Sequence, residues 1–138
     1  RMRVGTPPVL QMAALDAALD VWDGVSLDDV RAKSIELSEL FIREVEKRCP
    51  LLSLISPRDS STRGSQVSFA WEHGYAVIQA LIAHGVIGDF RAPNVMRFGF
   101  TPLYIDEKDV LKSVDILEKI MNEKLWDQDQ YKQRAAVT

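Results

Sequence analysis

The sequence predicts a single domain of the α+β class, in which a short antiparallel or mixed sheet carries its helices on one face. The chain has 138 residues, of which 46% are hydrophobic and 27% charged, as is usual for one soluble domain. The predicted order is helix, helix, strand, strand, helix, strand, strand, helix, with four short strands segregated from the helices. The sequence contains no internal repeat, low-complexity segment or linker that would divide it.

The first helix is predicted to begin after Thr6-Pro7-Pro8, where a hydroxyl at the N-cap precedes two prolines. It extends to about Trp22, and Gly24 is its expected C′ residue. Apolar residues surround it almost completely. The polar exceptions are Gln11, Asp16 and Asp20. Such a helix is expected to be covered on several sides, by other elements or by another chain.

Ser26 and Asp29 are spaced nearly as in a capping box and predict a second, long helix. It continues to about Arg48, and Pro50 ends it. Its apolar stripe is Val30, Leu37, Phe41 and Val45. A strand is predicted over 51–56, followed by a polar loop over 57–64.

The second half of the chain supplies the other strands. Alternating polarity predicts a strand over 66–71. The remaining elements are a helix over 75–84, strands over 86–90 and 95–100, and a helix that Asp106 caps and that ends near Lys124. We expect residues 125–138 to form a loose C-terminal tail and residues 1–124 to form the domain.

Composition excludes several classes of function. A single cysteine, Cys49, excludes a disulfide framework and a multi-cysteine zinc site. A net charge of −3 gives no basic surface for nucleic acid. No apolar run approaches the length of a membrane span, and the N-terminus does not resemble a signal peptide. We therefore expect a cytoplasmic protein that binds neither nucleic acid nor membrane.

Few residues suggest catalysis. His73 and His84 are not spaced as metal ligands, and each is interpreted as a structural or surface residue. All seven lysines lie in charged helical or tail stretches, without the desolvation or cationic neighbour that activates a Schiff-base lysine. No glycine-rich phosphate loop, nucleophile elbow or zinc-protease motif occurs. The chain by itself is thus predicted to be inactive.

Arg97 is the exception among the charged residues. It lies in the predicted strand over 95–100 with its side chain directed away from Met96 and Phe98, and Gly99 beside it leaves space for a ligand. A guanidinium can bind a carboxylate through two parallel hydrogen bonds. Arg97 could equally be an edge arginine or part of a structural ion pair. Thr6 has similar alternatives, because its hydroxyl could cap the helix or bind a phosphate at the helix N-terminus.

Five segments, in the same order, resemble the C-terminal part of bacterial-type kynureninases. They are RVGTPPVL (3–10), LDDVRAKS (27–34), RGSQVSF (63–69), GVIGDFR (85–91) and MRFGFTPLY (96–104). The resemblance implies the small C-terminal domain of a fold-type I enzyme dependent on pyridoxal 5′-phosphate. Such an enzyme hydrolyses L-kynurenine to anthranilate and L-alanine in tryptophan degradation, as a cytoplasmic homodimer. Either L-kynurenine or 3-hydroxykynurenine could be the preferred substrate.

The resemblance also assigns roles to individual residues. Arg97 matches the arginine that holds the substrate α-carboxylate. Gly5 and Thr6 match a segment that reaches the cofactor phosphate of the neighbouring subunit, although some members have asparagine in place of Thr6. Arg63 and Tyr104 are also matched and are interpreted as structural. The cofactor-bearing lysine would lie upstream of this chain, and the first 24 residues would bridge to that upstream domain or to the partner subunit.

Two alternatives remain open at this stage. The chain could be the small domain of another enzyme of the class V aminotransferase superfamily, such as a desulfurase or an aminotransferase. It could also be a stand-alone α+β module that binds a small anion through Arg97.

Overall fold

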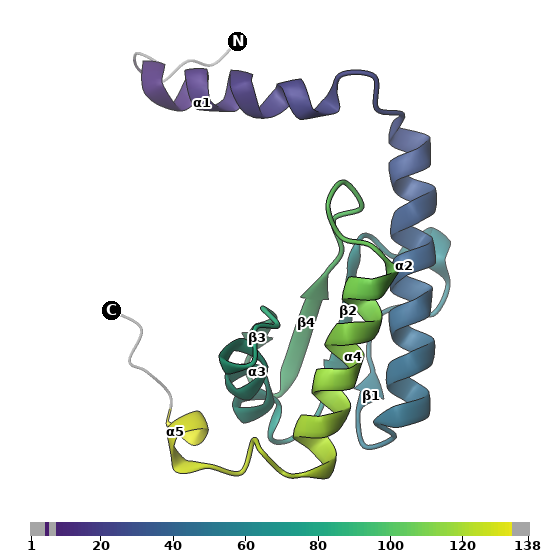
Figure 1. Ribbon diagram of the computed structural model, residues 1–138, viewed down its shortest axis with the longest axis vertical. Coiled ribbons are helices and arrows are strands. Elements are labelled where there is room, and N and C mark those ends of the chain that lie inside the picture. Colours follow the sequence, from purple (N-terminus) through teal and green to yellow (C-terminus); the bar gives the residue numbers. More distant parts are fainter. Residues whose placement is uncertain (1–4, 6–7, 134–138) are drawn as a thin grey trace.

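The chain folds around a four-stranded antiparallel sheet with strand order β1-β2-β4-β3 (Figure 1). The structure is a computed structural model that describes residues 5 and 8–133. The strands are β1 (Ser53–Leu54), β2 (Gln66–Ala70), β3 (Asp89–Arg91) and β4 (Val95–Gly99). The predicted α+β class is confirmed, and the sheet is antiparallel at all three junctions.

Three helices cover one face of this sheet and enclose the core. They are α2 (Leu27–Arg48), α3 (Gly74–Ala83) and α4 (Glu107–Asn122). Because side chains alternate across a strand, Phe69 and Phe98 point from the sheet into the core, where Phe41 of α2 packs against both rings. Phe69 and Leu117 of α4 are almost fully buried. The face of the sheet away from these helices, here called the Arg97 face, carries polar residues.

Local hydrogen bonds fix where α2 and α4 begin. The Ser26 hydroxyl accepts a hydrogen bond from the Asp29 backbone N–H, as the spacing predicts. Asp106 and Asp109 form a reciprocal capping box at the start of α4. Both caps satisfy backbone donors that have no partner within the helix.

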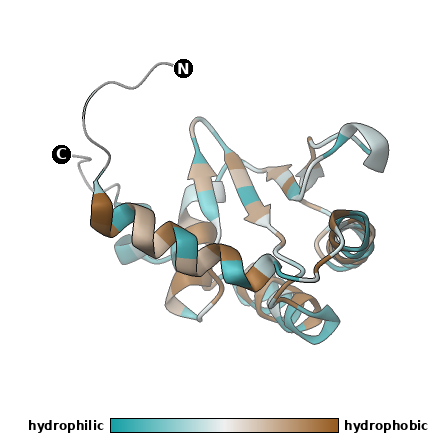
Figure 2. Cartoon of the chain, turned by 90° about the horizontal axis from the view of Figure 1, so that it is seen from above, coloured by the Kyte–Doolittle hydropathy of each residue, from teal (hydrophilic) through white to brown (hydrophobic). Residues whose placement is uncertain are grey.

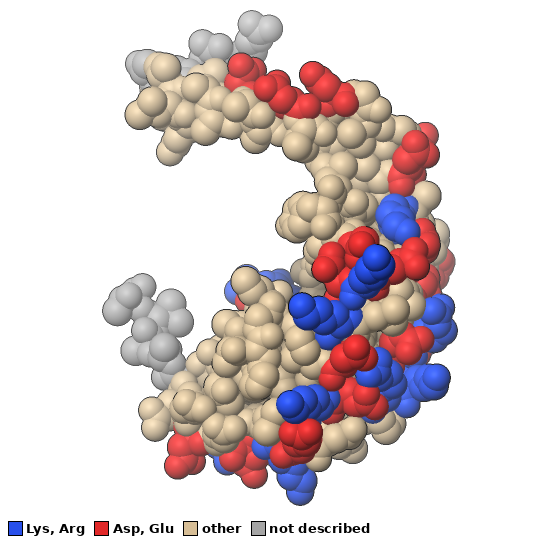
Figure 3. All heavy atoms as spheres, in the orientation of Figure 1, with Lys and Arg blue, Asp and Glu red and all other residues tan. Residues whose placement is uncertain are grey.

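The helix α1 (Val9–Leu19) and the short 3₁₀ helix η1 (Asp20–Trp22) project from the rest of the molecule (Figures 1 and 2). Every residue from 8 to 24 is exposed, and Leu10 retains 87% of its accessible surface. The burial that the sequence predicts for this helix is therefore not supplied by the described part of the chain. Figure 3 shows charged side chains of both signs gathered over α2 and α4, whereas the projecting arm of α1 and η1 shows acidic groups along one edge and is otherwise uncharged.

Two strands are shorter than predicted because turns replace their outer residues. The 51–56 segment forms only β1, and Leu51 lies in the turn after α2. The strand predicted over 86–90 begins at Asp89. Val86 instead donates its N–H to the Leu81 carbonyl, and Gly85, with φ of 85°, donates to Ile82. This pattern is a helix C-terminal cap at the glycine, and its second hydrogen bond takes up Val86, so β3 begins later than predicted.

The segment after α4 differs from the loose tail predicted over 125–138. Trp126 is 9% exposed. Its ring stacks on His73 at a centroid distance of 4.5 Å and meets Trp71 edge-on at 5.0 Å. The helix α5 (Asp129–Lys132) follows and contacts α3. Aromatic packing between residues distant in sequence orders 125–133, while residues 134–138 lie outside the described part.

None of the helices within residues 8–133 combines the length and the apolar character that crossing a bilayer requires.

Candidate functional site

Arg97 lies near the middle of the Arg97 face, on the inner strand β4. The register places it opposite Ser68 on β2 and opposite Asp89 on β3. Its side chain is 28% exposed. Gly99, two residues further on the same face, has no atom within 4 Å of the position that a Cβ would occupy. The space beside Arg97 that the sequence predicts is therefore present.

An ion pair with Asp89 determines the orientation of Arg97. Arg97 donates from Nε to Asp89 Oδ2 at 2.7 Å and also donates from Nη2 to the same oxygen. These hydrogen bonds hold the pKa of Asp89 below its usual range. The Arg91 Nε lies 3.7 Å from this oxygen. Nη1 of Arg97 and the second hydrogen of Nη2 form the outer edge of the guanidinium. No residue that the structure describes accepts a hydrogen bond from this edge.

The sequence offers an ion pair as one alternative for Arg97 but does not identify its partner. Asp89 is eight residues upstream, and the β3–β4 hairpin brings it opposite Arg97. The signal was available, because a turn centred on the predicted 92–94 break places these two positions in register. The structural ion pair therefore exists, and it leaves part of the guanidinium free for a ligand.

The other residues singled out by the family resemblance lie elsewhere. Gly5 is exposed with φ of 100°, and no contact joins it to Arg97. Thr6 lies outside the described residues. Arg63 is 5% exposed and donates to the Pro57 carbonyl at 2.7 Å, while its other nitrogen pairs with Glu39. Arg63 thus anchors the 57–64 loop to α2 and has a structural role.

The remaining chemically versatile side chains have structural partners. Nδ1 of His84 lies 2.8 Å from the Ala80 carbonyl, and His73 stacks on Trp126. Cys49 is buried, and burial raises the pKa of its thiol to about 11. No cluster of three potential metal ligands occurs within the described ranges.

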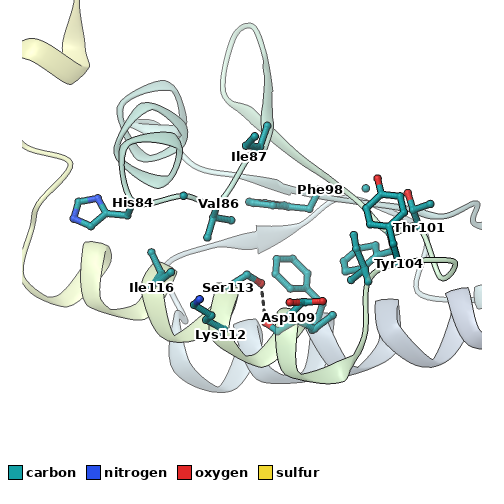
Figure 4. A pocket seen from close by; sticks show the side chains of 16 residues that line it. His84, Val86, Ile87, Phe98, Thr101, Tyr104, Asp109, Lys112, Ser113 and Ile116 are labelled. Atoms are coloured by element: carbon teal, nitrogen blue, oxygen red, sulfur yellow. Dashed lines mark hydrogen bonds between the residues drawn. The ribbon is translucent and has the colours of Figure 1, made fainter.

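A pocket of about 710 Å³ lies between Phe98 of β4 and the helix α4 (Figure 4). Phe41 and Phe98 line it together with Asp109 and Lys112 of α4, and Arg97 does not. The lining includes Gly99, so the pocket reaches the end of β4 beyond Arg97. Tyr104, at the end of the loop after β4, is exposed and lines the pocket.

Comparison with known proteins identifies the family. The model of the family described as "Kynureninase C-terminal domain" matches residues 30–117. The chain is 47% identical over its full length to a kynureninase of Pseudomonas fluorescens and 44% identical to one of Burkholderia mallei. It covers 34% of each relative, so it spans about a third of their length.

Solved structures share the fold at lower sequence identity. A NifS-like protein matches with a TM-score of 0.72 and 15% identity, over 88% of this chain and 36% of that protein. An acetylornithine aminotransferase from Elizabethkingia anophelis matches with a TM-score of 0.61 and 22% identity, over 88% of this chain and 32% of that protein. These likenesses concern the fold alone, whereas the family match covers most of the sequence. The chain belongs to the kynureninase C-terminal domain family.

Proposed function

We propose that this chain is the C-terminal part of a kynureninase that hydrolyses L-kynurenine to anthranilate and L-alanine. The family match and the two relatives at 44–47% identity support this function. The observation that carries the role of this part is the partly exposed guanidinium of Arg97 on the Arg97 face. Its free edge has the geometry to bind the α-carboxylate of an amino-acid substrate.

The lysines of this chain do not fit covalent attachment of pyridoxal phosphate. None of them is buried. The pKa of Lys33 is raised by Glu107 and Glu36, and the pKa of Lys132 is raised by Asp127. A Schiff-base lysine needs the opposite shift. The cofactor would therefore be held mainly by the two thirds of a kynureninase that this chain does not cover, and this chain by itself would be inactive.

The contribution of Arg97 would be to orient the substrate. A carboxylate fixed by two parallel hydrogen bonds loses most of its rotational freedom, so the bond to be cleaved is presented in one geometry. Lysine retains the charge but lacks the planar pair of donors. The chain thus supplies positioning, and the electron-withdrawing chemistry belongs to the cofactor.

Residues 1–24 would connect this domain to the upstream domain or to the partner subunit of a cytoplasmic homodimer. The exposed apolar side chains of α1 support this part of the proposal. In such an assembly Gly5 and Thr6 would approach the cofactor phosphate.

Substrate comparison with the complete protein tests the proposed activity. L-Kynurenine, 3-hydroxykynurenine, L-cysteine and amino donors for transamination are supplied at matched concentrations, and product formation is followed. We expect hydrolysis of one or both kynurenines to dominate. Release of sulfur from cysteine or dominant transamination would favour the desulfurase or aminotransferase alternative, which the shared fold also supports.

The stand-alone module is tested separately by calorimetry. In this alternative the 138-residue chain alone would bind simple carboxylates through Arg97. We expect no binding of acetate or L-kynurenine at millimolar concentrations, because one partly solvated arginine rarely holds a small anion by itself. Tight binding by the isolated chain would contradict the proposed division of function.

A further inference from the structure

We propose that Asp89 is a positioning residue that holds the Arg97 guanidinium side-on and so presents its outer edge to the substrate carboxylate. The inference rests on the proposed function of Arg97. It adds to that function a second residue, which the family resemblance did not single out. Asp89 would act through Arg97 and would not contact the substrate.

The first support is the distribution of donors on Arg97. A guanidinium has five N–H groups. Asp89 Oδ2 accepts from Nε and from Nη2, so it occupies one side of the fork. One hydrogen of Nη1 and the second hydrogen of Nη2 then form the outer edge. These are the donors that bind the two oxygens of a carboxylate in parallel.

The second support is that the backbone holds Asp89 in place. Asp89 and Arg97 are directly paired across β3 and β4, which brings their Cβ atoms within about 5.5 Å of each other. Gly88 precedes Asp89 and permits a close approach between the strands. A Cβ at Gly88 would lie 3.3 Å from the Arg97 carbonyl oxygen and 2.8 Å from Cδ1 of Ile78. The position of the Asp89 carboxylate is therefore set by the packing of β3 on β4 and α3.

The third support is the charge of the site. Arg97, Arg91 and the ionised Asp89 carry a net charge of +1, so the site still attracts an anion. On the other side of Arg97, Ser68 is neutral and 7% exposed. Among the described residues, Asp89 is thus the anionic group that restrains Arg97.

A competing role for Asp89 predicts the opposite effect on substrate binding when its charge is removed. If its carboxylate merely neutralised Arg97, removal of the charge would free donors and strengthen substrate binding. If it positions Arg97, removal leaves the long arginine side chain with more rotamers and weakens binding. The KM for substrate distinguishes the two roles.

The experiment uses the complete protein with L-kynurenine as the substrate. Asp89→Asn is expected to raise KM about tenfold, the scale of one hydrogen bond between charged groups, with a smaller change in kcat. Asp89→Glu retains the charge and should recover part of the loss. Glu72→Gln, which removes an exposed carboxylate from the turn between β2 and α3, is the matched control and should leave KM unchanged. Thermal unfolding of each variant confirms that it folds.

A double substitution separates this inference from the proposed function. In an Arg97→Lys background, Asp89→Asn should change KM less than twofold, because the fork that Asp89 orients is absent. An Asp89→Asn enzyme with unchanged or lower KM, beside an Arg97→Lys enzyme with raised KM, would refute the positioning role and leave the carboxylate role standing. An Arg97→Lys enzyme with unchanged KM would refute the proposed function itself. If Asp89→Asn raised KM by the same factor in the otherwise unchanged enzyme and in the Arg97→Lys enzyme, Asp89 would act independently of Arg97, and the positioning role would be refuted.

Discussion

The helices α1 and α4 show two different relationships between apolar sequence and burial. Both contain leucines, but Leu117 of α4 is 1% exposed, whereas Leu10 of α1 is 87% exposed. The apolar residues of α4 lie along one stripe that matches the sheet beneath it, while those of α1 surround the helix. The comparison shows that α4 belongs to the core, whereas no described part of the chain covers the apolar residues of α1.

The two helices therefore contribute differently to the stability of the folded chain. Burial of a leucine side chain contributes about 1.5–3 kcal/mol relative to exposure, and α1 gains none of this within the described chain. An isolated helix of 11 residues is marginal in water. The free energy of unfolding of this chain should therefore depend on α4 and hardly at all on α1.

Leu117→Ala should have the largest effect on stability. Truncation of this fully buried side chain leaves a cavity, and we expect the free energy of unfolding to fall by about 2–5 kcal/mol. Leu10→Ala is the matched control and should change it by less than about 0.5 kcal/mol. Urea unfolding of the 138-residue chain measures both. Equal losses in the two variants would show that α1 is packed in solution.

Trp126→Ala tests whether the segment after α4 belongs to the core. The indole stacks on His73 and meets Trp71 edge-on, so its loss should lower the free energy of unfolding by about 3 kcal/mol. Amide hydrogen exchange should then become faster in residues 125–133. Unchanged exchange there would indicate that the segment is loose, as the sequence predicted.

Asp106→Ala should have an intermediate effect. The side chain accepts hydrogen bonds from the backbone N–H groups of Lys108 and Asp109, and loss of such a cap costs about 1 kcal/mol. Thermal unfolding measures the change, with Asp16→Ala on the exposed α1 as the control. A loss as large in Asp16→Ala would be inconsistent with the comparison.

Truncation before Val25 should have a smaller effect still. Removal of α1 and η1 takes away only exposed residues, so the melting temperature should be unchanged, and the solubility of the chain should rise because apolar surface is lost. A clear drop in melting temperature would mean that α1 contributes to the fold of the isolated chain.

The smallest expected effect concerns pH. Arg97 holds the pKa of Asp89 below its usual range, so the folded chain binds fewer protons at this site than the unfolded chain. The resulting stability is present above the ordinary aspartate pKa of about 4 and is lost as the pH falls through the lowered folded value. Asp89→Asn should therefore destabilise the chain more near pH 7 than near pH 2, as urea unfolding at the two pH values would show. An equal effect at both would exclude a contribution from the charge.

Features set by local sequence were predictable, and features set by pairing were not. Ser26 and Asp106 predict where α2 and α4 begin, because a helix cap involves only the next few residues. The residue type of Val86 favours a strand, but its N–H bonds to the Leu81 carbonyl and extends the cap that Gly85 begins at the end of α3. The ordering of Trp126 depends on rings more than 50 residues away in sequence.

The candidate site also combines one residue that local sequence reveals with one that strand pairing brings to it. Arg97 stood out because its strand is otherwise uncharged and because the family resemblance assigns a role to it. Asp89 is eight residues upstream, and its pairing with Arg97 depends on the register of the β3–β4 hairpin and not on neighbouring residues. Thr6, predicted beside the cofactor phosphate, remains a prediction.

The most direct test of the account is the kcat/KM of the complete protein for L-kynurenine after Arg97→Lys. Loss of the two parallel hydrogen bonds should lower kcat/KM by the equivalent of about 2–4 kcal/mol, mostly through a higher KM. Arg43→Lys, on α2 and away from the Arg97 face, is the control and should change it little, because the Arg43 side chain is 65% exposed. Unchanged kinetics in the Arg97→Lys enzyme would contradict the assignment of Arg97 as the carboxylate-binding residue.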